Sequence, residues 1–248
     1  MTPTACHELI ELLCKAKTAE DIHSACSKFS AQFGFDHFIY GAQLPTSFVK
    51  PYFIIISGYP TEWRARYIAE NYIEIDPVVA HCYNHVTPIR WGQVAPQEKH
   101  SPTIRRFMGE AWDFGLKSGV SFPVHSSRGE FALLSLVSEQ NQAKVHADVV
   151  HVTPYAQYFV THVHEAARRV FEQQVLQLTR VHLTQKEQQC LLWSAEGKTT
   201  WEISVILRLS ERTVRFHLDN ASKKLNTVSR QHAVARAVSL GLINSHLG

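Results

Sequence analysis

The last quarter of this 248-residue chain carries three helix-start signals in close succession. The segments 184–187 (Thr-Gln-Lys-Glu) and 199–202 (Thr-Thr-Trp-Glu) are capping-box patterns, in which the threonine hydroxyl and the glutamate carboxylate accept from each other's backbone N–H groups. Ser210 is positioned to cap a third helix, and Gly197 is a suitable residue to end the first. Signals this close together permit only short helices joined by tight turns, so we expect this region to be all-α.

The third of these helices, expected over 211–225, is amphipathic. Its apolar side chains recur at steps of four, three and four residues: Val214, Leu218, Ala221 and Leu225. A stripe at this spacing is typical of a helix that packs one face on a core. A fourth helix is expected from about Gln231 to Leu240, ended by Gly241. It should bury a similar set: Ala233, Val234, Ala237 and Val238.

The other face of the 211–225 helix is polar and carries Arg212, Arg215, Asp219, Asn220 and Lys223. Two short helices joined by a tight turn, the second with Arg and Asn outward, form the architecture that places a helix in the major groove of duplex DNA. Residues 181–248 contain nine Lys or Arg against five Asp or Glu, so positive charge gathers where a polyanion would bind. On pattern alone, a small helical bundle with solvated charges is the alternative.

Residues 182–246 resemble the DNA-binding domain of LuxR-type regulators, a version shared with NarL-type response regulators. The motifs that carry the resemblance are Thr-x-x-Glu (184–187), Glu-Gly-Lys-Thr (196–199), Glu-Ile (202–203), Ser-Glu-Arg-Thr-Val (210–214) and His-Leu-x-Asn (217–220). The resemblance implies that 211–225 is the recognition helix and that Arg215 contacts bases. The DNA-binding candidates are Arg212, Thr213, Arg215, Phe216, Asn220 and Lys223. Asp219 stands where some relatives carry a basic residue, so no target sequence is implied.

The preceding part of the chain mixes helical and extended patterns. Ile22, Cys26, Phe29 and Phe33 give helical spacing over 19–33. Aromatic or β-branched runs bounded by Gly or Pro predict strands over 35–42, 53–57, 119–124 and 131–137. Further helices are expected over about 60–71, 76–85, 101–117 and 143–172, the last kinked or divided by Pro154. This order predicts an α/β sensor domain with an antiparallel sheet flanked by helices (1–175), a linker (176–181) and the all-α helix-turn-helix domain (182–248).

One set of aromatic and acidic residues stands out in the expected sensor domain: Tyr59, Trp63, Tyr67, Asp76 and Trp91. Trp63 and Tyr67 are four residues apart, so their rings lie on one face of a helix. Spacing alone favours plain packing of aromatic side chains in a core.

The set also resembles the N-acyl-homoserine-lactone-binding domain of LuxR-type quorum-sensing receptors, over about 20–170, with 118–136 as the later pocket strands. By this resemblance, Trp63 donates its indole N–H to the lactone carbonyl and Asp76 accepts from the ligand amide N–H. Tyr59 and Ser135 donate to the amide carbonyl. Tyr67 and Trp91 pack on the acyl chain and the lactone ring.

The polarity of that assignment is coherent. Trp offers only a donor and ionised Asp only an acceptor, so the pair reads a carbonyl and an amide N–H. In an apolar pocket such groups reject ligands that leave them unpaired. Gly119 fills a family-typical backbone position, and Ile39, Val78 and Cys82 are candidates for lining an acyl tunnel.

Fifteen histidines raise the question of catalysis or metal binding. His162 and His164 are two apart on an expected helix, so they point to different faces and cannot chelate one ion in the usual helical manner. The chain has no Gly-x-Ser-x-Gly, P-loop or His-Glu-x-x-His motif. We therefore expect no enzyme and no cofactor beyond the lactone ligand. Two alternatives stay open: an N-terminal domain that senses a different small molecule or a phosphoryl signal, and one that hydrolyses lactones.

The remaining sequence features concern location and assembly. Five scattered cysteines without a Cys-x-x-Cys pair fit free thiols in a reducing compartment. No apolar run approaches the ~20 residues that span a bilayer, and the N-terminus lacks the basic start of a signal peptide. We expect a cytoplasmic protein with no membrane partner. It should bind duplex DNA as a homodimer, because one recognition helix contacts few base pairs.

Overall fold

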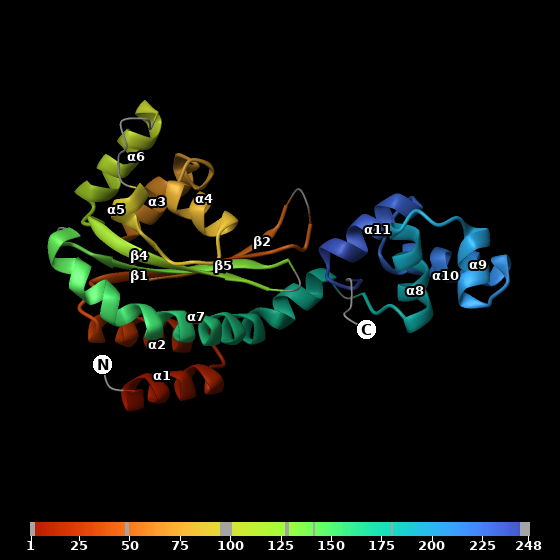
Figure 1. The fold of residues 1–248 in the computed structure, drawn as a ribbon, viewed down its shortest axis with the longest axis horizontal. Helices are drawn as coiled ribbons and strands as arrows, with labels where there is room; N and C mark the ends of the chain where they lie inside the picture. Colours follow the sequence, from red (N-terminus) through yellow and green to blue (C-terminus); the bar gives the residue numbers. More distant parts are fainter. Residues whose placement is uncertain are drawn as a thin grey trace. The chain divides into compact units, whose positions relative to one another are not determined.

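The computed structural model describes residues 3–47, 50–94, 101–126, 129–140, 142–179 and 181–243 (Figure 1). The chain separates into two compact units. The first is built from Met1–Gln43, Phe53–Ser126 and Phe131–Glu172, and the second contains Gln173–Gly248.

A five-stranded sheet organises the described part of the first unit, with the strand order β2-β1-β5-β4-β3. The strands are β1 (His37–Leu44), β2 (Tyr52–Ser57), β3 (Ile89–Arg90), β4 (Ser118–His125) and β5 (Phe131–Ser138). The pairs β1–β5, β4–β5 and β3–β4 are antiparallel. The predicted antiparallel sheet is therefore confirmed, and the four expected strands lie within two residues of their observed ends. The two-residue strand β3 was too short to be predicted.

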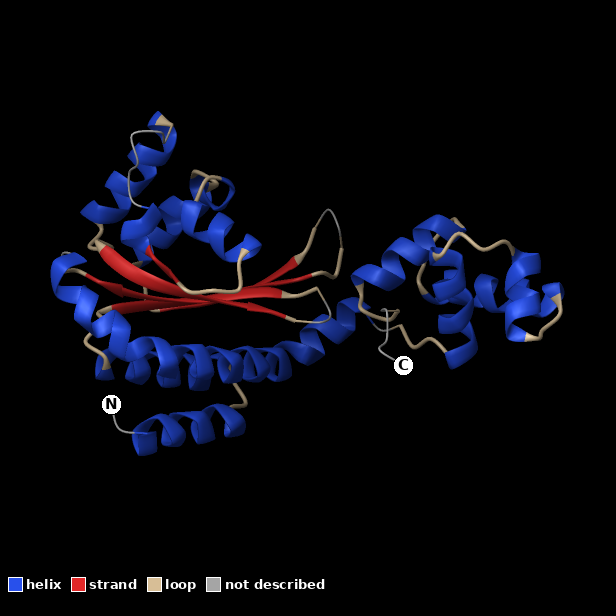
Figure 2. Cartoon of the chain, viewed as in Figure 1, coloured by secondary structure: helices blue, strands red, loops and turns tan. Residues whose placement is uncertain are grey.

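Helices cover both faces of this sheet, as Figure 2 shows. On one face lie α2 (Ala19–Gln32) and the long α7 (Gln142–Thr179), with α1 (Pro3–Lys15) packed on the outer side of α2. The other face carries α3 (Thr61–Ala69), the 3₁₀ helix η1 (Tyr72–Glu74), α4 (Pro77–Asn84), α5 (Trp91–Val94) and α6 (Pro102–Asp113). The sheet is thus the middle layer of an α/β domain.

Register determines which side chains face which layer. The hydroxyl of Tyr40 on β1 hydrogen-bonds with Nδ1 of His164 on α7 (2.8 Å), and both side chains are buried. Leu134 lies opposite Tyr40 in the ladder and so faces α7 as well. The neighbouring position on β5, Ser135, must then face the α3–α6 side, because successive side chains in a strand alternate.

Two of the expected helix boundaries were wrong for identifiable reasons. The helix expected to reach 117 ends at Asp113, since Gly115 adopts a φ of 87° and the N–H of Leu116 bonds back to the Ala111 carbonyl (3.0 Å). The helix expected over 60–71 ends at Ala69, and Asn71 turns the chain with a φ of 51°. Proline 154 does not divide α7. The side chains of Val152 and Ala156, two residues before and after it, are fully buried.

The second unit contains α8 (Gln185–Ala195), α9 (Thr200–Leu207), α10 (Glu211–Lys224) and α11 (Arg230–Ser239). Both capping boxes are present, at Thr184 and Thr199, and Ser210 caps α10 by accepting from the N–H of Thr213. Gly197 follows α8 with a φ of 76°, as expected of a helix end. The predicted all-α helix-turn-helix arrangement is confirmed.

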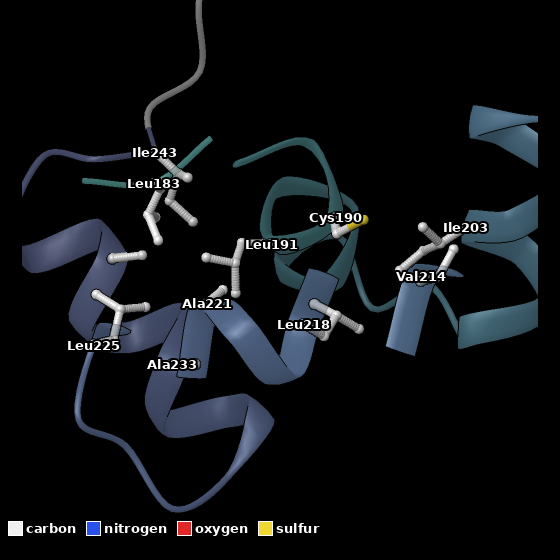
Figure 3. Close-up of a cluster of buried hydrophobic side chains, with 11 residues drawn as sticks. Leu183, Cys190, Leu191, Ile203, Val214, Leu218, Ala221, Leu225, Ala233 and Ile243 are labelled. Carbon is white, nitrogen blue, oxygen red and sulfur yellow. The ribbon is translucent and has the colours of Figure 1, made fainter. Parts of the chain in front are cut away.

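These helices share one apolar core, drawn in Figure 3. The stripe on α10 that the sequence predicted is buried in full, and Leu191, Ala221 and Leu225 point toward one another in the close-up. One expectation for α11 was wrong, because Val238 is 46% exposed while Ala233 and Ala237 are fully buried. Residue 238 lies about 100° around the helix from residue 237, which places it beyond the narrow face that the two alanines turn inward.

Candidate functional site

Asp76 is the N-cap of α4. Its Oδ1 accepts from the backbone N–H groups of Val78 (2.8 Å) and Val79 (3.3 Å), while Pro77 occupies the first helical position, where its missing N–H costs nothing. The second oxygen, Oδ2, accepts from the Tyr67 hydroxyl (3.0 Å). Local sequence therefore fixes one oxygen of the carboxylate, and α3 orients the other.

Burial sets the protonation chemistry of this group. It raises the pKa of the Asp76 carboxyl above its ordinary value, although the hydrogen bonds from Val78, Tyr67 and Val79 oppose the shift. Burial also raises the pKa of the Tyr59 and Tyr67 phenols, and the charge of Asp76 raises both further. The two phenols therefore remain protonated and can act as hydrogen-bond donors beside an acceptor.

Trp63 is held in a cluster of aromatic rings and is only 2% exposed. Its ring centroid lies 6.1 Å from that of Tyr67 in a T-shaped arrangement, 5.9 Å from Phe107 and 5.5 Å from Phe114. Tyr72 completes the cluster at 5.9 Å. Within the described residues, the indole N–H makes no hydrogen bond. Packing therefore fixes the ring and leaves its donor uncommitted.

A cluster of ion pairs and hydrogen bonds centred on Glu110 lies beside this aromatic group. Arg66 donates to both carboxylate oxygens of Glu110 (2.9 and 3.1 Å), and Arg106 and the Tyr72 hydroxyl donate to the same carboxylate (2.8 and 2.6 Å). The hydrogen bonds from Arg66 and Tyr72 hold the pKa of Glu110 at about 2. Because these residues come from α3, η1 and α6, the cluster ties α3, which carries Trp63, to two elements whose aromatic rings pack on it.

A second polar chain runs across the sheet. The indole N–H of Trp91 donates to Ser121 Oγ (3.0 Å), and Ser121 Oγ lies 2.7 Å from Ser135 Oγ. Ser135 also acts on the Tyr59 phenol and opposes the rise in its pKa. Trp91 and Ser135, both singled out in the sequence, are thus joined through Ser121, which was not.

The candidates for an acyl tunnel lie near this chain. Ile39 pairs with Ser135 across the β1–β5 ladder and is half-buried. Val78 is 8% exposed and Cys82 fully buried, in a cluster with Ile89, Phe131 and Leu133. All three line the α3–α6 side of the domain, so the fold brings them close to the polar groups.

The described residues offer no group of three or more His, Cys, Asp or Glu that is placed to hold a metal ion. Of the histidines weighed in the sequence, His164 is buried against Tyr40 and His162 stands edge-on to the ring of Tyr158 (4.8 Å). In the described chain, no helix combines the length and apolar character required to cross a membrane.

The other candidate surface lies on α10 in the second unit. Arg212, Arg215, Phe216 and Lys223 are exposed, Phe216 by 60%, and Asn220 is half-buried. Thr213 takes part in the helix cap, with its hydroxyl 2.8 Å from that of Ser210. The guanidinium of Arg215 lies 3.7 Å from the Glu211 carboxylate one turn earlier. The helix therefore presents a basic face with one exposed aromatic ring, opposite its buried stripe.

Sequence reasoning missed Ser121 and Glu110. Ser121 lies two residues after Gly119 in a strand, so period-two alternation places both on one face, but only the register with β5 puts Ser121 opposite Ser135. Glu110 has the i,i+4 relation to Arg106 as its signal in the sequence, and nothing local points to its contact with Arg66.

Comparison with known families gives two matches. Residues 18–167 match the family described as "Autoinducer binding domain". Residues 181–237 match "Bacterial regulatory proteins, luxR family". The chain is 32% identical over 236 residues to transcriptional activator protein VanR of Vibrio anguillarum, covering 92% of this chain and 93% of the relative. It is also 32% identical to transcriptional activator protein LuxR of Aliivibrio fischeri, covering 96% and 94%.

Solved structures with the same fold cover nearly the whole chain. The chain matches Escherichia coli SdiA with a TM-score of 0.78 at 23% identity, covering 97% of this chain and 98% of that one. SdiA in complex with octanoyl-rac-glycerol gives 0.76 at 22% identity, with 99% of each chain covered. At this identity the likeness establishes the two-domain fold.

Proposed function

Since the chain belongs to the luxR family of bacterial regulatory proteins, we propose that it is a quorum-sensing transcription regulator that binds an N-acyl-homoserine lactone in its first unit and duplex DNA through α10. The family membership rests on two matched domains and on relatives aligned over nearly the whole chain. The ligand class and the residues that bind it are our proposal.

The observation that carries the proposal is the pairing of one desolvated acceptor with several hydrogen-bond donors. Asp76 is acceptor-only when ionised, and Tyr67 already donates to one of its oxygens. Tyr59 and Ser135 can each donate a hydrogen bond. The charge of Asp76 raises the pKa of Tyr59 and so keeps that phenol protonated. An amide offers one N–H and one carbonyl oxygen in a fixed relation, which this set matches. The uncommitted Trp63 N–H adds a donor for the lactone carbonyl.

A second observation supports a small-molecule site. Tyr59, Tyr67 and Asp76 keep part of their surface accessible, although desolvation is the main cause of each pKa shift. Side chains that are surrounded by protein atoms but keep some accessible surface are expected to line an enclosed space. The partly accessible Trp91 and Ile39 would provide apolar walls for the lactone ring and the acyl chain.

The DNA-binding half of the proposal places Arg212, Arg215, Phe216, Asn220 and Lys223 against the major groove, with Thr213 at the helix start. We propose a homodimer on a pseudo-palindromic site, because a single recognition helix supplies too few contacts for tight binding. The functional boundaries proposed are 1–175 for ligand binding, 176–181 for the linker and 182–248 for DNA binding. The regulator would act in the cytoplasm, where its DNA target lies.

The decisive experiment combines ligand and DNA binding. Purified protein would be screened by thermal shift against straight-chain lactones from N-butanoyl to N-dodecanoyl, and the best ligand tested for its effect on DNA affinity. A ligand at a hundredfold excess over its Kd should stabilise the fold by about 2.7 kcal/mol. Recovery of intact lactone after incubation would support a binding protein over a hydrolase. Absence of stabilisation by every lactone would overturn the ligand class.

An acyl glycerol is the comparison ligand, since octanoyl-rac-glycerol is the molecule named with one solved neighbour. An ester lacks an N–H that could donate a hydrogen bond to Asp76. In the acyl glycerol only the glycerol hydroxyls could donate in its place. We therefore expect 1-octanoyl-glycerol to bind more weakly than the best lactone. Tighter binding by the glycerol would favour a different small-molecule signal.

A further inference from the structure

Ser121 has no role in the proposed ligand contacts, yet it touches two residues that do. It accepts from the Trp91 indole N–H (3.0 Å) and lies 2.7 Å from the Ser135 hydroxyl oxygen. The two serines are direct partners in the β4–β5 ladder, so they share one face of the sheet. Ser121 is fully buried and Ser135 is 2% exposed.

The number of available protons sets the direction of the hydrogen bonds among Trp91, Ser121 and Ser135. An indole N–H can only donate, so Ser121 Oγ must accept at its contact with Trp91. Ser121 then has one proton of its own to place, and among the described residues Ser135 Oγ is the acceptor within reach. A buried hydroxyl that donates to nothing loses a hydrogen bond that it made with water before folding, which is unfavourable. The favoured arrangement therefore runs from Trp91 to Ser121 to Ser135.

That direction decides what Ser135 can offer. Once Ser135 accepts from Ser121, its own proton points away from Ser121 and toward Tyr59, the partner that it would exchange for a ligand carbonyl. A ligand carbonyl placed there would accept from the Ser135 and Tyr59 hydroxyls, whereas a ligand N–H would offer these two protons no acceptor.

We propose that Ser121 is a positioning residue that fixes Ser135 as a hydrogen-bond donor and thereby makes the site select ligands with a carbonyl oxygen next to the group read by Asp76. This inference rests on the proposed function and deepens it. Ser121 acts through Ser135 and does not itself contact the ligand. Trp91 has a double role, because its ring packs against the site while its N–H sets the polarity of the two serines.

The test compares two probes in binding titrations with full-length protein. One is the tightest straight-chain N-acyl-homoserine lactone of the panel, and the other is its N-alkyl counterpart, in which CH₂ replaces the amide carbonyl. Ser121→Ala should weaken binding of the N-acyl probe about 3- to 10-fold and change that of the N-alkyl probe less than about twofold. Ser121→Thr, which keeps the hydroxyl, should restore the preference.

Control variants separate positioning from stability. Ser118→Ala removes another buried hydroxyl from β4, one that donates to the Gln140 carbonyl (2.6 Å), and should leave the ratio of the two affinities unchanged. If Ser121→Ala folds poorly, Ser121→Cys keeps the volume with only a weak donor and should show the same loss of preference. In a Ser135→Ala background, Ser121→Ala should have no further effect.

The outcomes distinguish this inference from the function beneath it. Wild-type protein that binds no lactone would overturn both. Wild-type protein that binds lactone, combined with a Ser121→Ala variant of unchanged preference, would overturn the inference alone. An additive loss in the double variant would also overturn it, because Ser121 would then act independently of Ser135.

Discussion

The indole of Trp91 lies so close to the backbone of Gly119 that a Cβ atom on residue 119 would sit 3.0 Å from the indole Cε2. The same Cβ would lie 2.7 Å from the Leu136 carbonyl oxygen on the neighbouring strand. The glycine is therefore required for space. Two residues further along β4, Ser121 accepts from the indole N–H, so Gly119 and Ser121 together form the surface that seats Trp91.

A side chain at position 119 should disturb both the sheet and the ligand site. Gly119→Ala forces β4 away from β5 or displaces the indole, and we expect the free energy of unfolding to fall by about 1–3 kcal/mol. Urea denaturation would measure this. The matched control is Gly109→Ala in α6, where an added Cβ meets nothing within 4 Å. That change should stabilise the helix by about 0.5–1 kcal/mol, and an equal loss in both variants would contradict the steric account.

Asp76→Asn should weaken lactone binding while preserving the fold. The amide oxygen of asparagine can still cap α4, whereas the charge-assisted hydrogen bond to the ligand is lost, which corresponds to about 1.5–3 kcal/mol, or roughly 10- to 150-fold in Kd. Calorimetric titration of both proteins with the best lactone measures the change. Equal affinities would remove Asp76 from the site.

The same variant has a pH signature without ligand. The folded-state pKa of Asp76 is raised by burial, so the stability that its protonated form contributes is fully present below the ordinary carboxyl pKa of about 4 and is lost as pH rises through the folded pKa. Asp76→Asn should abolish that loss. Denaturation midpoints of the two proteins, measured from pH 4 to pH 8, should therefore diverge in favour of the variant as pH rises.

Trp63→Phe should remove one donor while keeping most of the ring in its aromatic cluster. We expect lactone affinity to fall about 2- to 13-fold, since an uncharged hydrogen bond contributes about 0.5–1.5 kcal/mol. Trp112→Phe serves as the control, because Trp112 is 45% exposed on α6. Affinities should be measured by calorimetry, because both changes remove a tryptophan and would alter a fluorescence signal. A lactone that bound both variants equally well would leave the Trp63 indole N–H without a role in recognition.

The pair formed by Glu187 and Lys224 should stabilise the second unit in a pH-dependent way. Lys224 Nζ lies 2.7 Å from Glu187 Oε2, and Glu187 also belongs to the Thr184 capping box. Burial alone would raise the pKa of Glu187, but the hydrogen bonds from Lys224 and Thr184 outweigh it and lower the pKa. Glu187→Gln should cost about 1–2 kcal/mol near neutral pH.

The sign of this second effect is opposite to that of Asp76. A lowered folded-state pKa gives stability that is present above the ordinary value and lost as pH falls through the folded value. The gap between wild type and Glu187→Gln should therefore close in acid. Glu196→Gln, at an exposed carboxyl after α8, is the control and should change the denaturation midpoint little at either pH. If the difference in stability between wild type and Glu187→Gln persisted in acid, the lost stability would come from packing and not from the charge of Glu187.

Arg215→Ala should affect sequence-specific DNA binding. If Arg215 donates to a guanine edge, the variant loses about 1–3 kcal/mol on the cognate site and specificity relaxes at that base pair. Lys223→Ala, on the same helix, should instead weaken all duplexes about equally if it contacts phosphate. Mobility-shift titrations over single-base variants of the site distinguish the two patterns. Equal loss on every sequence for Arg215→Ala would make it a phosphate contact.

The sequence determined the local features of this protein. The capping boxes at Thr184 and Thr199, the Ser210 cap and the α10 stripe depend on residues within four positions of each other, so short-range hydrogen bonding and helical periodicity were sufficient to predict them. The N-cap role of Asp76 is equally local. Its aromatic neighbours were identified by spacing and by resemblance to a family.

Only the tertiary structure decided which distant side chains meet. Strand register placed Ser121 opposite Ser135, and the packing of α3 against α6 brought Arg66 to Glu110. Neither contact leaves a signal within one helix or strand, because register and layer packing depend on the hydrophobic faces of several elements at once. For the same reason Val238 could not be placed by its own helix: Ala233 and Ala237 turn toward the core shared with α8 and α10, and Val238 lies to the side of them.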